Sequence, residues 1–196
     1  MANTESLYGK EKRQNKKNRI ASAVLFVLIA VLLLVVVMNV FVYITVEVDG
    51  VSMYPTLNDM DVVKANKHKD FSYGDIVVIE KTEGNEKYNI VKRVIAMGGD
   101  HLEIKDYKVY LNGEVLTEDY VKDDPATELV DESRTYGDID LIVPDGKIFY
   151  LGDNRINSID SRDDGCCDEK DVIGVIEGWS ISTRGIRNFF YDLLFR

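Results

Sequence analysis

The stretch ASAVLFVLIAVLLLVVVM, residues 21–38, sets the architecture of this chain of 196 residues. Ser22 is its one polar residue, and the apolar character continues past Asn39 to Ile44. About 20 consecutive apolar residues cross the hydrocarbon core of a bilayer as a helix, and a longer run is accommodated by tilting. The sequence therefore predicts a transmembrane anchor over residues 20–46.

A cleaved secretory signal also begins with basic residues followed by an apolar run. Its apolar core is normally only about 7–15 residues long and ends at a small-x-small cleavage site. Here the run is longer, and its exit, NVFVY at residues 39–43, contains no such site. These features favour a retained anchor over a removable signal.

The distribution of charge predicts the orientation of this anchor. Residues 1–19 contain six basic and two acidic residues, whereas the whole chain has a net charge of −10. Basic residues beside a spanning helix stay on the cytoplasmic side, which favours a topology signal over a nucleic-acid-binding arm. We expect residues 1–19 to be a cytoplasmic tail of a single-pass plasma-membrane protein. The acidic residues 47–196 then form an extracytoplasmic domain, whose charge excludes nucleic acid as the main partner.

After the anchor, short apolar and β-branched segments alternate with turn residues. One of them runs into Asn112 and Gly113, a dipeptide typical of hairpin turns. Many short strands with frequent turns indicate an all-β or mainly β domain. The polar stretch 117–140 has little periodicity and is interpreted as a variable insert. The expected strands include residues 76–79, 91–95, 109–111, 147–151 and 172–176, and residues 186–195 are expected to be helical.

The sequence gives little support to metal chemistry. His68 and His101 have no metal-ligand spacing, and the acidic run over residues 160–171 lacks the order of a calcium loop. We therefore expect no metal and no organic cofactor. Cys166 and Cys167 are adjacent, which leaves three states open: a strained vicinal disulfide, two reduced thiols, or oxidised thiols.

A serine and a lysine offer a different chemistry. Ser52 lies in a turn-prone segment shortly after the apolar run, and Lys92 lies in VKRVI, residues 91–95, a strand that is otherwise apolar apart from Arg93. A serine hydroxyl becomes a useful nucleophile when a neighbouring base takes its proton. Burial lowers the pKa of a lysine, so that a neutral amine is present near neutral pH. A single serine or a single lysine usually has no catalytic role, so the interpretation depends on the surrounding sequence.

Ser52 and Lys92 belong to a set of four short blocks that occur in order after the anchor. These blocks resemble those of the type I signal peptidases, the membrane-anchored Ser/Lys proteases of bacteria, in particular of Gram-positive organisms. The resemblance runs from the anchor to about Trp179, and four blocks in register are a far stronger signal than any one of them. The blocks are SMYPTL (residues 52–57), GDIVV (74–78), KRVIAMGGD (92–100) and GDNR (152–155), the last continuing through Asn157, Ser158, Asp160, Ser161 and Arg162.

The resemblance implies a mainly β serine endopeptidase that removes signal peptides from exported preproteins without a cofactor. Ser52 would be the acylated nucleophile, Lys92 the general base, and the Ser52 backbone N–H one oxyanion donor. Ser158 would orient the lysine amine. Its partners would be preproteins and membrane lipid, close to the secretion translocase. The charged residues that would brace the site by ion pairing are Arg93, Asp153, Asp160 and Arg162.

Two departures from the family pattern stand out. Many relatives have a hydroxyl residue two positions before the nucleophile, where this chain has Gly50, so a backbone or water donor would have to replace that side chain at the oxyanion. The third block ends in Gly98, Gly99 and Asp100 where the family usually has Pro-Gly-Asp. Neither change removes a group that acyl transfer requires.

Several apolar residues outside the blocks have two interpretations. Met53, Tyr54 and Trp179 either form a rim that faces the membrane or pack in the core. The aromatic end of the chain, residues 184–196, either lies on the membrane as an amphipathic helix or docks on the body.

Two other functions are compatible with a β domain of this kind. A self-cleaving repressor of the same Ser/Lys clan would need a cytoplasmic DNA-binding domain, and the anchor occupies its place. A catalytically idle anchored β domain that binds an extracytoplasmic partner would need neither Ser52 nor Lys92.

Overall fold

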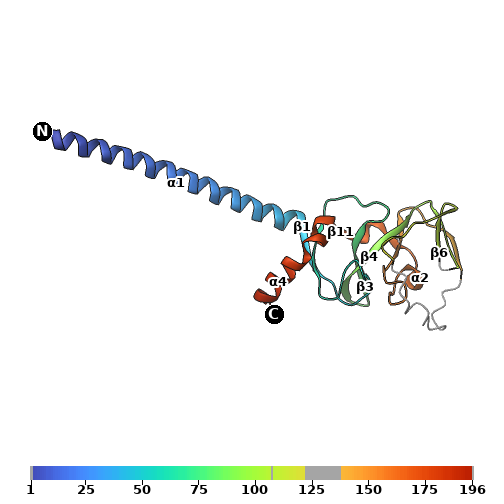
Figure 1. Ribbon diagram of the computed structural model, residues 1–196. Helices are drawn as coiled ribbons and strands as arrows, with labels where there is room; N and C mark the ends of the chain where they lie inside the picture. Colours follow the sequence, from blue (N-terminus) through green and yellow to red (C-terminus); the bar gives the residue numbers. More distant parts are fainter. Residues whose placement is uncertain (1, 107, 122–137, 196) are drawn as a thin grey trace. The chain divides into compact units, whose positions relative to one another are not determined.

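The computed structural model describes residues 2–106, 108–121 and 138–195 (Figure 1). It consists of two units, Met1–Val42 and Tyr43–Arg196. The first is an apolar helix and the second is a mainly β body, which confirms the predicted class of fold.

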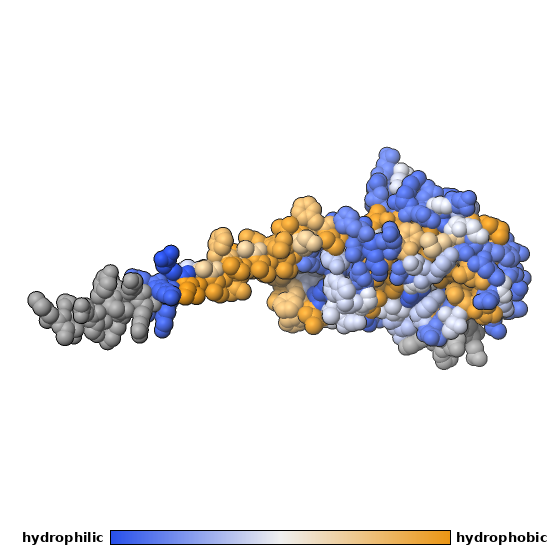
Figure 2. Space-filling model, turned by 90° about the horizontal axis from the view of Figure 1, so that it is seen from above, coloured by the Kyte–Doolittle hydropathy of each residue, from blue (hydrophilic) through white to orange (hydrophobic). Residues whose placement is uncertain are grey.

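The first unit is helix α1, Ala2–Val42. Its segment Gln14–Val42 is long and apolar enough to cross a membrane, with a mean hydropathy of 3.4. Figure 2 shows its apolar side chains as an almost continuous orange stretch. The helix ends before the predicted end of the anchor at residue 46, because Ile44 and its neighbours form strand β1, Tyr43–Glu47, which pairs with β2. Aromatic and β-branched residues favour this extended conformation.

The described strands of the body form two sheets in which all pairings are antiparallel. The larger has the order β1-β2-β11-β3-β4-β9-β10 and the smaller the order β7-β6-β5-β8 (Figure 1). Besides β1, the strands are β2 Val62–Asn66, β3 Ile76–Glu83, β4 Glu86–Met97, β5 His101–Lys105, β6 Lys108–Leu111, β7 Glu114–Val115, β8 Ile139–Ile142, β9 Lys147–Leu151, β10 Cys167–Asp168 and β11 Val172–Ile176.

The strands expected from the sequence lie within β3, β4, β6, β9 and β11. Asn112 and Gly113 connect β6 to β7 with φ of 54° and 85°, the positive values that a tight hairpin turn requires. Most of the proposed insert over residues 117–140 lies outside the described residues. Its described parts are residues 117–121 and 138–140, and β8 begins within the latter.

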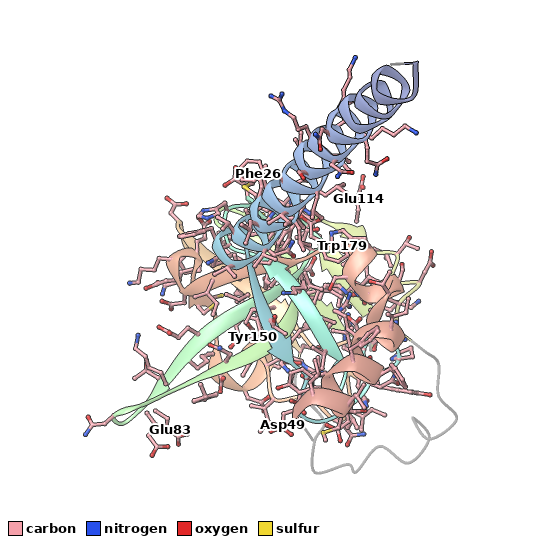
Figure 3. The ribbon with its side chains drawn as sticks, turned by 90° about the vertical axis from the view of Figure 1, so that its left-hand side faces the viewer. Phe26, Asp49, Glu83, Glu114, Tyr150 and Trp179 are labelled. Atoms are coloured by element: carbon pink, nitrogen blue, oxygen red, sulfur yellow. The ribbon has the colours of Figure 1, made fainter. Side chains whose placement is uncertain are left out.

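Strand β4 lies at the centre of the body. It contributes Val91, Val94 and Ile95 to three different clusters of buried apolar residues. Tyr150 of β9 packs with Val94 and is fully buried. In Figure 3, Tyr150 lies within the body, whereas Glu83 lies at the tip of the β3–β4 hairpin. Because β4 is buried on both faces at residues 91–96, any polar side chain in that stretch is withdrawn from water.

Short helices follow the strands: α2 Ser161–Asp164, the 3-10 helix η3 Glu169–Asp171, α3 Gly178–Ser182 and α4 Arg184–Phe195. Polar residues of α4 hold it to the body. Arg184 Nε lies 2.9 Å from Asp61 Oδ2, and Asn188 Oδ1 accepts a hydrogen bond of 2.8 Å from Val62 N–H. Apolar side chains of α4 are left exposed. Helix α4 therefore docks on the body through polar residues and presents an apolar surface. The exposed apolar residues of α4 are Ile186, Phe189, Phe190, Leu193 and Leu194.

Candidate active site

The structure brings together Ser52 and Lys92, which lie 40 positions apart in the sequence. Lys92 Nζ is 2.7 Å from Ser52 Oγ. Lys92 is 4% exposed, and this burial lowers the pKa of its amine, although the carboxylates of Asp160 and Asp153 act in the opposite direction. A neutral amine at this distance is placed to accept the proton of the serine hydroxyl.

Buried apolar residues hold the loop that carries Ser52. Met53 and Leu57 are fully buried in the core cluster that also contains Val91 of β4. Of the two interpretations of Met53, the structure supports packing in the core: this residue anchors the loop that carries Ser52. Tyr54 and Trp179, at 42% and 47% exposure, remain on the surface.

Gly50 begins the same loop with a φ of +86°. Its N–H donates a hydrogen bond of 2.8 Å to Asp59 Oδ1. A side chain at this position would meet open space, since an added Cβ has no neighbour within 4 Å. The N–H of Gly50 is thus already used by Asp59, and the structure does not provide the second oxyanion donor from this residue.

Residues 152–154 pack directly on Ser52. The N–H of Asn154 donates to the carbonyl oxygen of Ser52 at 3.0 Å, and Asn154 Nδ2 donates to Val51 O at 3.1 Å. A Cβ added to Gly152 would lie 2.5 Å from Ser52 O and 2.3 Å from Ser158 Oγ. Only glycine permits this approach. In the sequence, only the place of Asn154 in the fourth block marks it, and nothing there points to these two bonds.

A bidentate ion pair links β4 to this region. Arg93 Nε donates to Asp153 Oδ1 at 2.8 Å, Nη2 donates to Oδ2 at 2.6 Å, and Nη1 donates to Gly74 O at 2.6 Å. Thr56 Oγ1 donates to the same Asp153 Oδ2 at 2.5 Å. Asp153 is 2% exposed and therefore joins the strand of the lysine to the loop of the serine. A bidentate pair between arginine and a carboxylate fixes the relative orientation of the two side chains and also contributes binding energy.

A second bidentate pair lies beside it. Arg162 Nε and Nη2 donate to Asp160 Oδ1 and Oδ2 at 2.8 and 2.9 Å, and Gly152 N–H donates to Asp160 Oδ2 at 3.0 Å. Burial opposes ionisation of Asp160, but the Arg162 guanidinium and the Gly152 N–H hold the pKa of that carboxyl below its usual value. Asp160 therefore stays ionised and adds negative charge near Lys92.

Ser158 does not form the contact that was expected of it. Its hydroxyl is buried, and Ser158 Oγ makes no hydrogen bond of ordinary geometry with the described part of the chain. It lies against Gly152 and is not bonded to Lys92 Nζ.

Two residues of the proposed insert also reach the site. Arg155 Nη1 donates to Glu118 Oε2 at 2.9 Å, and Arg155 Nη2 bonds to Glu118 Oε1. The ring centroid of Tyr120 is 3.8 Å from the guanidinium carbon of Arg93. No pattern in the sequence pointed to these contacts.

The cysteines are separate from this network. Cys166 and Cys167 are both free thiols. Burial raises the pKa of both, that of Cys167 to about 11. Among residues 2–106, 108–121 and 138–195, no group of three or more His, Cys, Asp or Glu is placed to hold a metal ion.

Comparison with known proteins gives a consistent result. The family model described as signal peptidase, peptidase S26, matches residues 20–179. Signal peptidase I P of Bacillus subtilis subsp. natto is 38% identical over 177 residues, which cover 87% of this chain and 93% of that protein. Signal peptidase I of Bacillus licheniformis is 38% identical over 170 residues, covering 84% and 90%. A crystal structure of a signal peptidase I from Enterococcus faecalis V583 is 32% identical, with a TM-score of 0.46, and covers 56% of this chain and 98% of that one.

The family match extends over most of the chain, and these two relatives are similar to it along most of their own length. The chain belongs to the signal peptidase family, peptidase S26.

Proposed function

We propose that this protein is a membrane-bound signal peptidase I, a serine endopeptidase that removes signal peptides from exported preproteins. Membership of the family supports the activity and the substrate class. The observation that carries the Ser/Lys mechanism is the separation of 2.7 Å between Ser52 Oγ and the buried Lys92 Nζ. Pairing a desolvated amine with a hydroxyl is a means of activating a nucleophile.

In the acylation step, neutral Lys92 takes the hydroxyl proton as Ser52 Oγ attacks the carbonyl carbon of the scissile peptide bond. The tetrahedral intermediate then breaks its C–N bond, and the lysine ammonium gives its proton to the leaving amine of the mature protein. In deacylation, Lys92 takes a proton from water, which attacks the ester. The signal peptide leaves with a free carboxylate, and the proton returns to Ser52 Oγ.

The negative oxygen of the tetrahedral intermediate needs donors. The Ser52 backbone N–H is one, and removal of a single donor of this kind typically costs about 10²–10³ in kcat. Asp160 and Asp153 are each paired with an arginine; Asp160 also binds the Gly152 N–H, and Asp153 also accepts a bond from Thr56 Oγ1.

We place α1 across the plasma membrane, with residues 1–19 in the cytoplasm and the body outside it, near the secretion translocase. The basic tail and the apolar segment Gln14–Val42 support this orientation. The exposed apolar residues of α4 support a second contact with lipid, in which this helix lies on the bilayer surface. A preprotein held in the membrane by its signal peptide would present its cleavage site at the depth of such a body.

The alternative is a catalytically idle domain that binds a partner outside the cell. Burial of a lysine beside a serine costs free energy and serves no purpose in such a domain. The geometry of Ser52 and Lys92 therefore favours the enzyme.

Cleavage of a preprotein by the full chain in detergent micelles distinguishes the peptidase from the idle binding domain. We expect Ser52→Ala and Lys92→Ala each to lower kcat by more than about a thousandfold. Matched controls are Ser72→Ala, at an exposed serine, and Lys87→Ala, at an exposed lysine of the same strand β4, and both should cleave like the unaltered chain. Cleavage at the unaltered rate by the Ser52 and Lys92 variants would show the mechanism to be wrong.

A further inference from the structure

Residues 117–121 open the polar stretch that the sequence presented as an insert, yet two of their side chains contact arginines of the active site. We propose that Glu118 and Tyr120 are positioning residues for the cleavage reaction. They act through Arg155 and Arg93, which hold residues 152–154 against Ser52. This inference rests on the proposed function, since it assigns a role within the same site.

Tyr120 covers one face of the Arg93 guanidinium. Its ring centroid lies 3.8 Å from Arg93 Cζ, close enough for a cation–π contact. The edges of the same guanidinium bond to Asp153 and Gly74 O. With its face covered by the ring, the Arg93 side chain is 11% exposed, and the pair with Asp153 is shielded from water. Shielding strengthens an ion pair whose partners are already in contact.

Glu118 and Tyr120 also bind each other. The Tyr120 hydroxyl donates to Glu118 Oε1 at 2.8 Å. Burial and the nearby Glu118 carboxylate raise the pKa of Tyr120 above its ordinary value of 10.0, so the hydroxyl stays a neutral donor. The two side chains therefore form one unit that reaches both arginines.

Through Arg155, this unit reaches the backbone of Gly152. Glu118 accepts two bonds from the Arg155 guanidinium, whose Nε donates to Gly152 O at 3.1 Å. The side chains of Arg155 and Glu118 are 17% and 13% exposed, so the pair is better shielded than an ordinary surface ion pair. The carbonyl of Arg155 in turn accepts from Arg162 Nη2 at 2.7 Å.

Gly152 is thus held on both sides of its backbone. Its N–H is bound by Asp160 at 3.0 Å and its carbonyl by Arg155 at 3.1 Å. Two residues further along, the Asn154 N–H donates a hydrogen bond of 3.0 Å to Ser52 O, which a fixed Gly152 helps to hold in place. Loss of the Glu118 carboxylate would free Arg155, loosen residues 152–154 and widen the range of distances between Ser52 Oγ and Lys92 Nζ. A misplacement of about 1 Å costs about 10²-fold in rate.

The test compares Glu118→Gln and Tyr120→Leu with Tyr120→Phe, which keeps the ring over Arg93. Controls are Glu114→Gln and Tyr88→Leu, both at exposed positions on strands. Three quantities are measured on the full chain in micelles: kcat and KM for preprotein cleavage, amide hydrogen exchange of peptides spanning residues 152–157, and the Tm. We expect Glu118→Gln and Tyr120→Leu to lower kcat by about 10–100-fold with little change in KM. Their exchange at residues 152–154 should quicken, while Tyr120→Phe and both controls stay within about threefold of the unaltered chain.

Unaltered kcat and unaltered exchange in Glu118→Gln and Tyr120→Leu would overturn the inference. A lower Tm with faster exchange throughout the body would also overturn it, because that is general destabilisation. If the unaltered chain fails to cleave while exchange at residues 152–154 still responds selectively, the proposed function is wrong and the positioning contact is upheld.

Discussion

Replacement of Gly152 with alanine tests how closely residues 152–154 pack on Ser52, the proposed nucleophile. The added Cβ would lie 2.5 Å from Ser52 O, about 0.9 Å inside the ordinary contact limit of 3.4 Å. Ser52 O is a backbone atom and cannot rotate away. The other contact, with Ser158 Oγ at 2.3 Å, involves a side chain that is itself buried. The loop of Ser52 must therefore move.

We expect displacement of this loop to lower both the stability of the body and kcat. Overpacking of a well-filled interior costs about 1–3 kcal/mol, which corresponds to a fall in Tm of about 2–12 °C for a body of this size. A displacement of the Ser52 loop by about 0.9 Å would disturb the contact of Ser52 Oγ with Lys92 Nζ and should lower kcat by about 10²-fold. The assays are preprotein cleavage and thermal unfolding of the full chain in micelles.

The matched control is Gly178→Ala, because a Cβ at that glycine meets nothing within 4 Å. It should change stability by no more than about 0.5 kcal/mol. In the double variant Gly152→Ala/Ser158→Gly, the overlaps with the Ser158 side chain are removed and the contact with Ser52 O persists, so stability should partly recover while kcat stays low. The reasoning is refuted if Gly152→Ala cleaves within about threefold of the unaltered chain at an unchanged Tm.

Three further predictions follow from the charges, the surface and the thiols. Asp160→Asn should destabilise the body by about 3–5 kcal/mol, because it removes the carboxylate of a buried ion pair. It should also move the acid limb of the cleavage rate to lower pH, since the Asp160 charge raises the pKa of Lys92; an unmoved limb would contradict this. In vesicles with brominated lipid, fluorescence of the single tryptophan, Trp179, should be quenched, and less so when the five exposed apolar residues of α4 are replaced by serine; equal quenching would argue against lipid contact by α4. Because burial raises the pKa of Cys167 to about 11, its thiol should react with a disulfide reagent only after unfolding, and rapid reaction in the folded state at pH 7 would contradict the burial.

Three of the predicted strands, β3, β4 and β9, are buried on both faces over the predicted residues and therefore read as largely apolar runs in the sequence. Ile76 in β3 and Phe149 in β9 belong to such runs. Strands β2 and β5 carry polar residues such as Lys64 and Glu103 on their less buried positions, and their patterns are too short to distinguish from loop. The sequence predicts an anchor that extends into β1, because Ile44 and its neighbours continue the apolar run. These residues form a strand because they pair with β2, which is distant in the sequence.

Ser52 and Lys92 could be singled out from the sequence as candidate site residues, and the structure places their side chains in contact. The contacts that support them join residues far apart in the chain. Thr56 bonds to Asp153 across 97 positions, and nothing local marks either as the partner of the other. Met53 illustrates the same limit, since the local sequence around an apolar residue in a turn gives no sign of whether its side chain is buried or exposed.

The pH dependence of kcat/KM for preprotein cleavage tests most directly whether the neutral amine of Lys92 activates Ser52. A protonated amine cannot accept the hydroxyl proton, so the rate must be low at acid pH and rise as Lys92 loses its proton. Since burial lowers the pKa of Lys92 below its ordinary value of 10.5, this rise should begin well short of that pH. It should be absent in Lys92→Ala. A rate that stays high well below neutral pH would contradict the role of Lys92.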